Sequence, residues 1–461
     1  MRSPAYLPIL RLAICNSKFA ITVLATCLSA LCLCASVVKV QAAEPAALDP
    51  AVARAQGFRV LESKHLTLYT DVPSSAAVDE LPRVFDAAVP QWAAYFGIEP
   101  AKLADWRMRG FLMQSRERFA AAGLAPRELP EFKNGYSGGH DLWLYDQPSD
   151  YYRRHLLLHE GTHGFMNTQL GSCGAGWYME GVAELLGTHL WADGRLTLGV
   201  VPRDKEDVPL WGRIALVKAE IAAGRMRGID DIVNDAVPSF TDNESYAWCW
   251  ALATFLDGHP RYRPAFRGLQ KSVNDPHFNA AFRRAFAAEL PELRREWLTF
   301  ASELEYGVDV PRTAIAFRAG QPPAAAGTQA TVAADRGWQS SGVRLEAGRK
   351  YRIRAVGRYQ IAATETPPSG VGGAKQPWPC EPGGVTLRYY RGRPLGMLLG
   401  AVEPDPTSAN PPAALAPFAV GLDVIVEPST SGTLYLRVND SNGELDDNAG
   451  SLIAEITSED R

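Results

Sequence analysis

The stretch that decides the fold is His155–His189, which reads HLLLHEGTHGFMNTQLGSCGAGWYMEGVAELLGTH. Positions i and i+4 of a helix share one face, so His159 and His163 can point two imidazoles at one cation. Glu160 comes directly after the first histidine and can reach a water on that cation without being a ligand. This HExxH arrangement predicts a zinc site with the glutamate as general base.

Zinc in a catalytic site takes three protein ligands and keeps one position open. The stretch WYMEGVAEL predicts a second helix beside the first, and it makes Glu180 the expected third ligand. The alternative is that the histidines are hydrogen-bonded core residues of an apolar helix. His155, one turn before His159, is expected to flank the site or to act behind a ligand, because the HExxH pair already sets the geometry.

The two motifs together resemble the gluzincin metallopeptidases, particularly the M1-type aminopeptidases, in which HExxH is followed by a motif close to W-L-x-E-G-x-A. Here the second motif reads WYMEG and the interval is slightly shorter, so the chain is similar to bacterial peptidase-MA-like proteins. The resemblance implies that Glu180 is a zinc ligand. It also implies that Glu184 accepts a hydrogen bond from a zinc-bound histidine, although a salt-bridged surface role stays open.

The resemblance extends to SYAWCWALATFLDG, where Tyr246 matches a tyrosine that donates to the oxyanion of the tetrahedral intermediate. The alternative is a core aromatic residue on an apolar helix. GYSGGHDLWLYDQ lies where gluzincins place the edge strand that holds an extended substrate. Because this stretch lacks the G-x-M-E-N motif that captures a free amine, the resemblance favours an endopeptidase over an aminopeptidase.

The N-terminus predicts export. Arg2, Arg11 and Lys18 precede an uncharged run over 19–38 and then KVQAAEPAALDP, which is the pattern of a secretory signal. We expect residues 1–43 to be a signal peptide, with an uncleaved membrane anchor and lipidation at Cys27 as alternatives. The expected location is periplasmic or extracellular. The net charge of −4 and the absence of basic runs indicate no nucleic-acid partner.

Three cysteines follow the leader. Export permits disulfides, and Cys173 with Cys249 is the pair that could form within one domain. Three unpaired buried cysteines, with Cys380 as the third, are an equally weighted alternative.

The 461 residues predict more than one domain. We expect an α+β gluzincin-like catalytic domain over 44–310, with a small sheet and a mostly helical second half. A linker over 311–328 follows, and an all-β antiparallel sandwich occupies 329–461, where short alternating runs are separated by turn residues.

Side-chain oxygens are dense in the loop of LYLRVNDSNGELDDNAGSLIAEI, which suits calcium, although such residues also favour solvated turns. The segment resembles the last hairpin of the calcium-dependent galactophilic lectins of the PA-IL type. That resemblance implies calcium ligands at Asp440, Glu444, Asp447 and Asn448, with a backbone carbonyl near Ile361. It implies sugar binding as well, but no match to the lectins' histidine and glutamine sugar contacts is found.

These patterns together predict an exported zinc metallohydrolase that acts on peptides or proteins, with a C-terminal domain that binds calcium and, as the lectins do, glycans. The main alternative is a catalytically inactive carbohydrate-binding envelope protein with a vestigial metallopeptidase domain. A second alternative is a structural zinc site, in which Glu160 would have no purpose.

Overall fold

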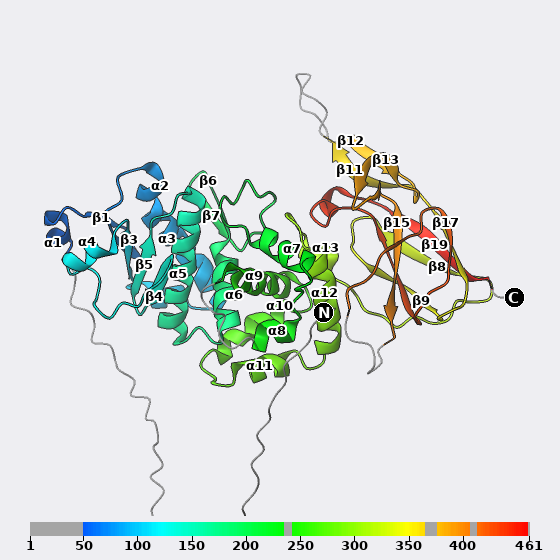
Figure 1. The fold of residues 1–461 in the computed structure, drawn as a ribbon, viewed down its shortest axis with the longest axis horizontal. Coiled ribbons are helices and arrows are strands. Elements are labelled where there is room, and N and C mark those ends of the chain that lie inside the picture. Colours follow the sequence, from blue (N-terminus) through cyan, green and yellow to red (C-terminus); the bar gives the residue numbers. More distant parts are fainter. Residues whose placement is uncertain (1–48, 235–241, 365–375, 406–412, 460–461) are drawn as a thin grey trace, which may run out of the picture. The chain divides into compact units, whose positions relative to one another are not determined.

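The computed structural model describes residues 49–234, 242–364, 376–405 and 413–459, and Figure 1 shows them as a ribbon. Residues Leu48–Arg461 form one compact unit that combines helices with several antiparallel sheets. The expected signal peptide over 1–43 lies outside the described residues. The domain boundary expected within the compact unit stays a prediction.

The first sheet has five strands in the order β1-β2-β3-β5-β4. Its strands are β1 (Arg59–Glu62), β2 (Leu66–Thr70), β3 (Met108–Met113), β4 (Gly135–Gly138) and β5 (Asp141–Tyr145). The central strands β2, β3 and β5 run parallel, whereas β1 and β4 pair antiparallel at the two edges. The stretch FRVLESKHLTLYTDVP forms β1 and β2.

Within GYSGGHDLWLYDQ only GYSG forms the edge strand β4, and the expected edge position is wrong for DLWLY, because β5 lies between β3 and β4. Four of the five β5 residues are buried. Asp141 tolerates this position because Arg109 Nε and Nη2 donate to its two carboxylate oxygens at 2.6 and 2.7 Å. A buried polar residue that is paired in this way gives a central strand the alternating polar and apolar sequence that is typical of a half-exposed strand.

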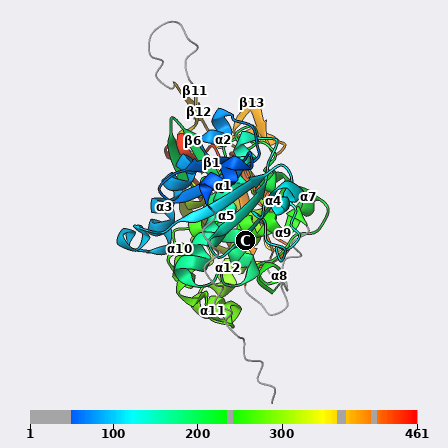
Figure 2. The same ribbon diagram turned by 90° about the vertical axis from the view of Figure 1, so that its left-hand side faces the viewer.

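Helices cover both faces of this sheet (Figures 1 and 2). One face packs with α3 (Leu81–Phe96) and α5 (Asp150–Leu170) in the largest core. The other face packs with α1 (Pro50–Ala55) and α4 (Arg116–Ala121) in a smaller core. The predicted end of α3 at Gly97 is confirmed, since Gly97 has a left-handed φ of 63° that favours glycine.

Helix α5 carries the HExxH motif and is buried along its central turns. It begins after Ser149, whose hydroxyl accepts a hydrogen bond from the Tyr152 amide as an N-cap. Gly161 lets the helix approach α3 closely, because a Cβ there would lie 2.7 Å from the Trp92 ring. The two imidazoles are therefore fixed against a rigid layer rather than a loop.

The second half of the region over 44–310 is nearly all helix, as predicted. Its elements are α6 (Gly176–Gly187), α7 (Arg213–Ala222), α8 (Ile229–Asn234), α9 (Asn243–Gly258), α10 (Arg263–Gly268), α11 (Phe278–Ala285), α12 (Leu290–Ser302) and α13 (Val310–Thr313), with the hairpin β6 (His189–Ala192) and β7 (Arg195–Leu198) and the 3-10 turn Leu269–Ser272. The short helix α2 (Ala76–Asp79) and the 3-10 turn Pro100–Leu103 lie in the first half. Helix α6 packs closely on α9, because a Cβ at Gly181 would lie 2.8 Å from the Cys249 carbonyl oxygen.

The C-terminal region is all β, and its two larger sheets have four antiparallel strands each, ordered β17-β10-β19-β8 and β16-β15-β18-β9. The strands are β8 (Thr328–Ala333), β9 (Gln339–Leu345), β10 (Tyr351–Val356), β11 (Tyr359–Thr364), β12 (Gln376–Cys380), β13 (Val385–Tyr390), β14 (Arg393–Leu395), β15 (Leu398–Pro404), β16 (Phe418–Ala419), β17 (Asp423–Val426), β18 (Gly432–Val438) and β19 (Ser451–Ser458), with a 3-10 turn at Leu445–Asp447. Side chains from both larger sheets share one core.

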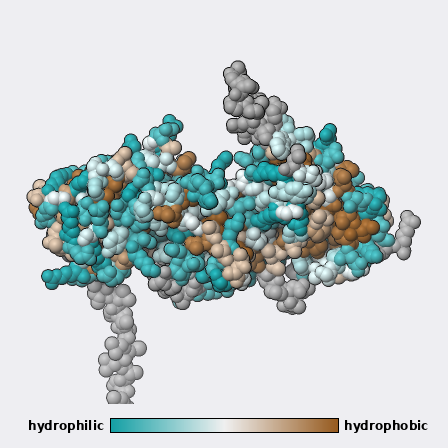
Figure 3. All heavy atoms as spheres, turned by 45° about the horizontal axis from the view of Figure 1, so that its top comes forward, coloured by the Kyte–Doolittle hydropathy of each residue, from teal (hydrophilic) through white to brown (hydrophobic). Residues whose placement is uncertain are grey.

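The surface is mixed, and Figure 3 shows hydrophilic residues over most of the drawn face, with the larger hydrophobic area over the C-terminal strands. Within the described residues, no helix is both long and apolar enough to cross a membrane. Cys173, Cys249 and Cys380 are buried and form no disulfide, so the pairing of Cys173 with Cys249 is not found.

Buried polar contacts join α12 to the C-terminal strands. Arg437 on β18 donates to Glu303 Oε2 at 2.8 Å and to the Asp440 carbonyl oxygen at 2.8 Å. Trp338 Nε1 donates to the other Glu303 oxygen at 3.0 Å. Because both charged residues are buried, each needs the other to remain ionised in the interior. The segment after α13 is also bound to α12, since the Ile315 amide donates to Glu296 Oε1 at 2.6 Å.

We expect Arg437→Met to lower the free energy of unfolding by about 3 kcal/mol, because the Glu303 carboxylate would stay buried without its cation. Urea unfolding followed by circular dichroism measures this. Arg352→Met is the matched control, since it breaks an exposed pair with Asp423 and should change stability little. Equal losses in the two variants would contradict the assignment.

Candidate metal centre

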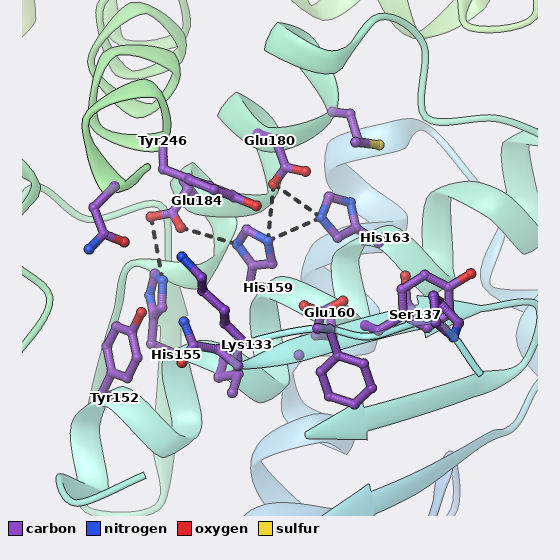
Figure 4. Close-up of a pocket in the computed structure, with 18 of the residues that line it drawn as sticks. Lys133, Ser137, Tyr152, His155, His159, Glu160, His163, Glu180, Glu184 and Tyr246 are labelled. Carbon is purple, nitrogen blue, oxygen red and sulfur yellow. Dashed lines mark hydrogen bonds and ion pairs between the residues drawn. The ribbon is translucent and has the colours of Figure 1, made fainter. Parts of the chain in front are cut away.

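Helices α5 and α6 bring three donor atoms together (Figure 4). Nε2 of His163 lies 3.1 Å from Nε2 of His159, and Glu180 Oε2 lies 3.2 Å from His159 Nε2 and 3.4 Å from His163 Nε2. Metal bonds of 2.0–2.2 Å in a tetrahedral site place ligand atoms about 3.3 to 3.5 Å apart. These three residues, the first donor group, are buried and could hold a metal ion.

The convergence of these ligand atoms supports a metal site. Glu180 Oε2 is buried and accepts no well-directed hydrogen bond, although two imidazole nitrogens lie within 3.4 Å of it. Two imidazole nitrogens and a carboxylate oxygen that converge on one point are expected where a cation completes the site. The predicted partnership of His159, His163 and Glu180 is therefore present in the structure.

Burial and mutual proximity shift the pKa values of these groups in opposite directions. Burial alone would lower the pKa of His159, but the Glu180 and Glu184 carboxylates raise it to about 9. For His163, burial lowers the pKa, yet Glu180 and Cys173 raise it well above its usual value. Burial alone would raise the pKa of Glu180, whereas the two histidines lower it to about 2. In the absence of metal, the histidines therefore hold protons at neutral pH.

Glu184 lies directly behind the first donor group, as the sequence resemblance implied. Its Oε1 is 3.3 Å from Nδ1 of His159, and its Oε2 is 3.5 Å from Nε2 of His155. A carboxylate on the outer nitrogen of a ligating histidine fixes the tautomer and orientation of that ring. Burial opposes ionisation of Glu184, but Arg213 and His155 keep its pKa well below the usual value.

Arg213 is the site residue that the sequence analysis missed. It is the first residue of α7, it is buried, and its Nε and Nη2 each donate to one oxygen of Glu184 at 2.9 Å. Its guanidinium also lies over the Tyr246 ring, 5.6 Å from the centroid. Arg213 lies 29 positions after Glu184, and no sequence motif relates two residues at that separation. The one local sign is the glycine before it, Gly212, which adopts a left-handed turn.

Glu160 faces the same cavity from the α5 side. It is buried, and burial raises its pKa despite the nearby histidines. Its carboxylate fits against Gly135 of β4, where a Cβ would lie 2.6 Å from Glu160 Oε1. The edge strand therefore positions the expected general base, and Gly135 is needed for this close approach.

Tyr246 comes from α9 and lies beside His159, with ring centroids 6.2 Å apart. Figure 4 shows its hydroxyl directed toward the region of Glu180 and His159. Burial raises its pKa, so the hydroxyl keeps its proton and can donate a hydrogen bond. The side chain is only partly buried and lines the cavity, unlike its fully buried neighbours Ala247 and Trp248. The alternative of a purely structural core aromatic does not fit this placement.

These residues border a cavity of about 510 Å³. Its wall includes the β4 residues Gly135, Tyr136 and Ser137, together with both histidines of the motif, Glu160, Glu180 and Tyr246. A cavity of this size accommodates a ligand rather than a single water. The donor atoms, the buried glutamate and the hydroxyl thus share one solvent-connected space.

The expected calcium ligands lie in the loop between β18 and β19, where the structure brings only some of them together. Asp440 is fully buried, and its Oδ2 accepts a hydrogen bond from Asn448 Nδ2 at 3.0 Å. Oδ1 of Asn448 is buried and has no hydrogen-bond partner. Glu444 instead directs its carboxylate to Arg388 at 2.5 Å, away from a shared cation.

Of the remaining two expected ligands, Asp447 lies in this loop and Ile361 lies on the neighbouring strand β11. The backbone next to Ile361 pairs with it, since Gln360 and Ala449 exchange amide hydrogen bonds of 2.9 and 3.1 Å. The Asp447 carbonyl oxygen accepts from Gln360 Nε2 at 2.6 Å. Among the described residues, the carboxylates of Asp440, Glu444 and Asp447 do not gather within reach of one ion.

Comparisons with known proteins leave the family open. No protein-family model matches the sequence, and no curated protein matches it. One similar solved structure is described as "EclA N-terminal domain; PllA-like lectin", and the match covers 28% of this chain and 95% of that chain. At 19% sequence identity and a TM-score of 0.20, this similarity is weak and partial, and it assigns no function.

We expect metal binding to release protons at pH 7.5, because His159 with a pKa of about 9 must lose its proton to become a ligand. The affinity for Zn²⁺ should therefore rise with pH up to about 9. Calorimetric titration in two buffers of different ionisation enthalpy measures the released protons. Heats that are identical in both buffers would contradict the protonation described above.

Proposed function

We propose that this chain is an exported zinc-dependent peptidase whose active site is the cavity beside α5 and α6. The observation that carries the proposal is the first donor group, in which two imidazole nitrogens and one carboxylate oxygen lie within 3.4 Å of one another. Two histidines and a glutamate with one open side suit a catalytic zinc ion. Export rests on the leader pattern of residues 1–43.

Zinc, when bound, supplies a water of lowered pKa. Glu160 would receive the proton of that water on its carboxylate and later donate it to the leaving amine. The raised pKa of Glu160 moves this carboxylate toward the range in which a general base works at neutral pH. Tyr246 would donate its hydroxyl hydrogen to the oxyanion that develops on the scissile carbonyl. Glu184 would hold His159 in the tautomer that leaves Nε2 free to bind metal.

The edge strand favours a peptide as the substrate. Within the described part of the chain, β4 pairs with β5 on one side only, and its residues line the cavity. An extended peptide can add to such an edge through backbone hydrogen bonds. Because the sequence has no motif for capturing a free amine, we favour an endopeptidase over an aminopeptidase.

We expect Glu160→Gln to reduce peptide cleavage by about 10² to 10⁴-fold, because the amide cannot accept the proton. Zinc-loaded protein is incubated with a mixed peptide library, and the products are read by mass spectrometry. Glu131→Gln is the matched control, since Glu131 lines the same cavity but is 90% exposed.

Cleavage by the parent and by Glu131→Gln, but not by Glu160→Gln, would support the proposal. Equal cleavage by all three chains would exclude Glu160 as the base. A parent that binds zinc but cleaves nothing would favour the alternative of an inactive carbohydrate-binding protein.

For the C-terminal region we infer an antiparallel β-sandwich that binds calcium in the loop over 440–448. The buried carboxylate of Asp440 and the buried Oδ1 of Asn448, which has no hydrogen-bond partner, support this, because carboxylate and amide oxygens suit a hard cation. Since its side chain pairs with Arg388, Glu444 would contribute its backbone oxygen. Glycans remain a proposed partner, on the sequence resemblance alone.

Calcium should raise the melting temperature of the parent and leave that of Asp440→Asn unchanged. Burial raises the pKa of Asp440 to about 7, far above an ordinary aspartate. In the calcium-free protein, the ionisation of Asp440 therefore lowers the free energy of unfolding as pH rises toward 7. Only the ionised form binds calcium. The calcium effect should be larger at pH 8 than at pH 6.

Differential scanning calorimetry at the two pH values tests this. Asp423→Asn is the control, because its exposed carboxylate pairs with Arg352 on the sheet surface. A calcium effect that survives in Asp440→Asn would place the ion elsewhere.

A further inference from the structure

The structure contains a second group of potential ligands that overlaps the first. His155 Nε2 and His159 Nδ1 lie 3.5 and 3.3 Å from the two oxygens of Glu184, and these atoms could also hold a metal ion. We call this set the second donor group. Both groups need His159, which would use Nε2 for the first group and Nδ1 for the second. A neutral imidazole has one lone pair, so His159 can serve only one group at a time.

One feature distinguishes the second donor group from the first. The Arg213 guanidinium donates to both oxygens of Glu184 at 2.9 Å, whereas no arginine or lysine donates to Glu180 among the described residues. A metal ion on Glu184 would have to displace this guanidinium or lie against it, because both Glu184 oxygens are already engaged. Like charges so close in a buried place repel each other strongly.

The chain places Arg213 firmly. The turn before it holds Leu210 at φ 71° and Gly212 at φ 62°, and the left-handed conformation is unfavourable for leucine. Trp211 is buried between them and packs edge-on against Trp250 of α9, with ring centroids 4.7 Å apart. The turn, which is strained at Leu210 and held by the packing of Trp211, therefore places Arg213 against the Glu184 carboxylate. Tyr152 also bonds to the guanidinium.

We propose that Arg213 is a positioning residue that reserves His159 for the first donor group. By occupying Glu184, it keeps a cation away from the second donor group. Glu184 then accepts a hydrogen bond from His159 Nδ1, and this leaves the Nε2 lone pair for the metal shared with His163 and Glu180. The inference rests on the proposed metal site and extends it to the choice between two overlapping sites.

The test asks whether removing the charge of Arg213 opens the second donor group. His163→Gln disables the first group, and zinc should then bind at least about 100-fold more weakly than to the parent. Adding Arg213→Met should restore at least about tenfold of that affinity, and adding His155→Gln as a third change should abolish the gain. Zinc affinity is measured by competition with a chromophoric chelator, and bound zinc is counted by mass spectrometry.

Two further variants keep the test decisive. Arg213→Lys in the His163→Gln background retains the positive charge, so zinc binding should stay weak. Arg213→Gln is neutral but can still donate to Glu184, and it replaces the Met variant if circular dichroism shows that the latter is unfolded. Arg225→Met is the control, because it removes an arginine whose side chain is 63% exposed and whose partner is Glu220, and it should not change zinc binding.

The outcomes are distinguishable. A parent chain that binds no zinc would overturn the proposed metal site itself. A parent that binds zinc, together with a folded His163→Gln/Arg213→Met or His163→Gln/Arg213→Gln chain that binds no more tightly than His163→Gln, would overturn the role of Arg213 alone. Restoration by Arg213→Lys as large as that by Arg213→Met would show that the charge is not the cause.

Discussion

The close packing of α5 against its neighbours is the constraint on which the rest of the site depends. Gly161 brings this helix against Trp92 of α3, and Gly181 brings α6 against the backbone of α9. Any side chain at these glycines would push the helices apart by more than the tolerance of a metal site. These two contacts help to fix the positions of the helices that carry the three donor atoms and Glu184.

Much of this could be predicted from local spacing. The i, i+4 relation of His159 and His163, the helix that carries Glu180 and the end of α3 at Gly97 are properties of short stretches, and the structure agrees with them. Arg213 could not be predicted, because its contact with Glu184 depends on how α7 lies along α9. The central position of β5 could not be predicted for a similar reason, since Asp141 is polar in sequence but is neutralised by Arg109 in the fold.

For the loop between β18 and β19, too, the composition could be predicted from the sequence but the tertiary contacts could not. Its oxygen-rich composition is plain in the sequence, and the structure buries Asp440 and Asn448 as a cation site would require. Composition alone does not show that this loop lies against the segment that follows α12, where Ser441 donates to Glu305 at 2.9 Å and Arg437 bridges Glu303 to the Asp440 carbonyl oxygen. A cation in this loop would therefore also stabilise the contact between the strands and the helical region.

The most direct measurement is the position of zinc in crystals of the zinc-loaded protein, from anomalous diffraction at the zinc absorption edge. The account predicts one strong peak bonded to His159 Nε2, His163 Nε2 and Glu180 Oε2, with the cavity on its open side. A peak between His155, His159 Nδ1 and Glu184, or none near α5, would contradict it.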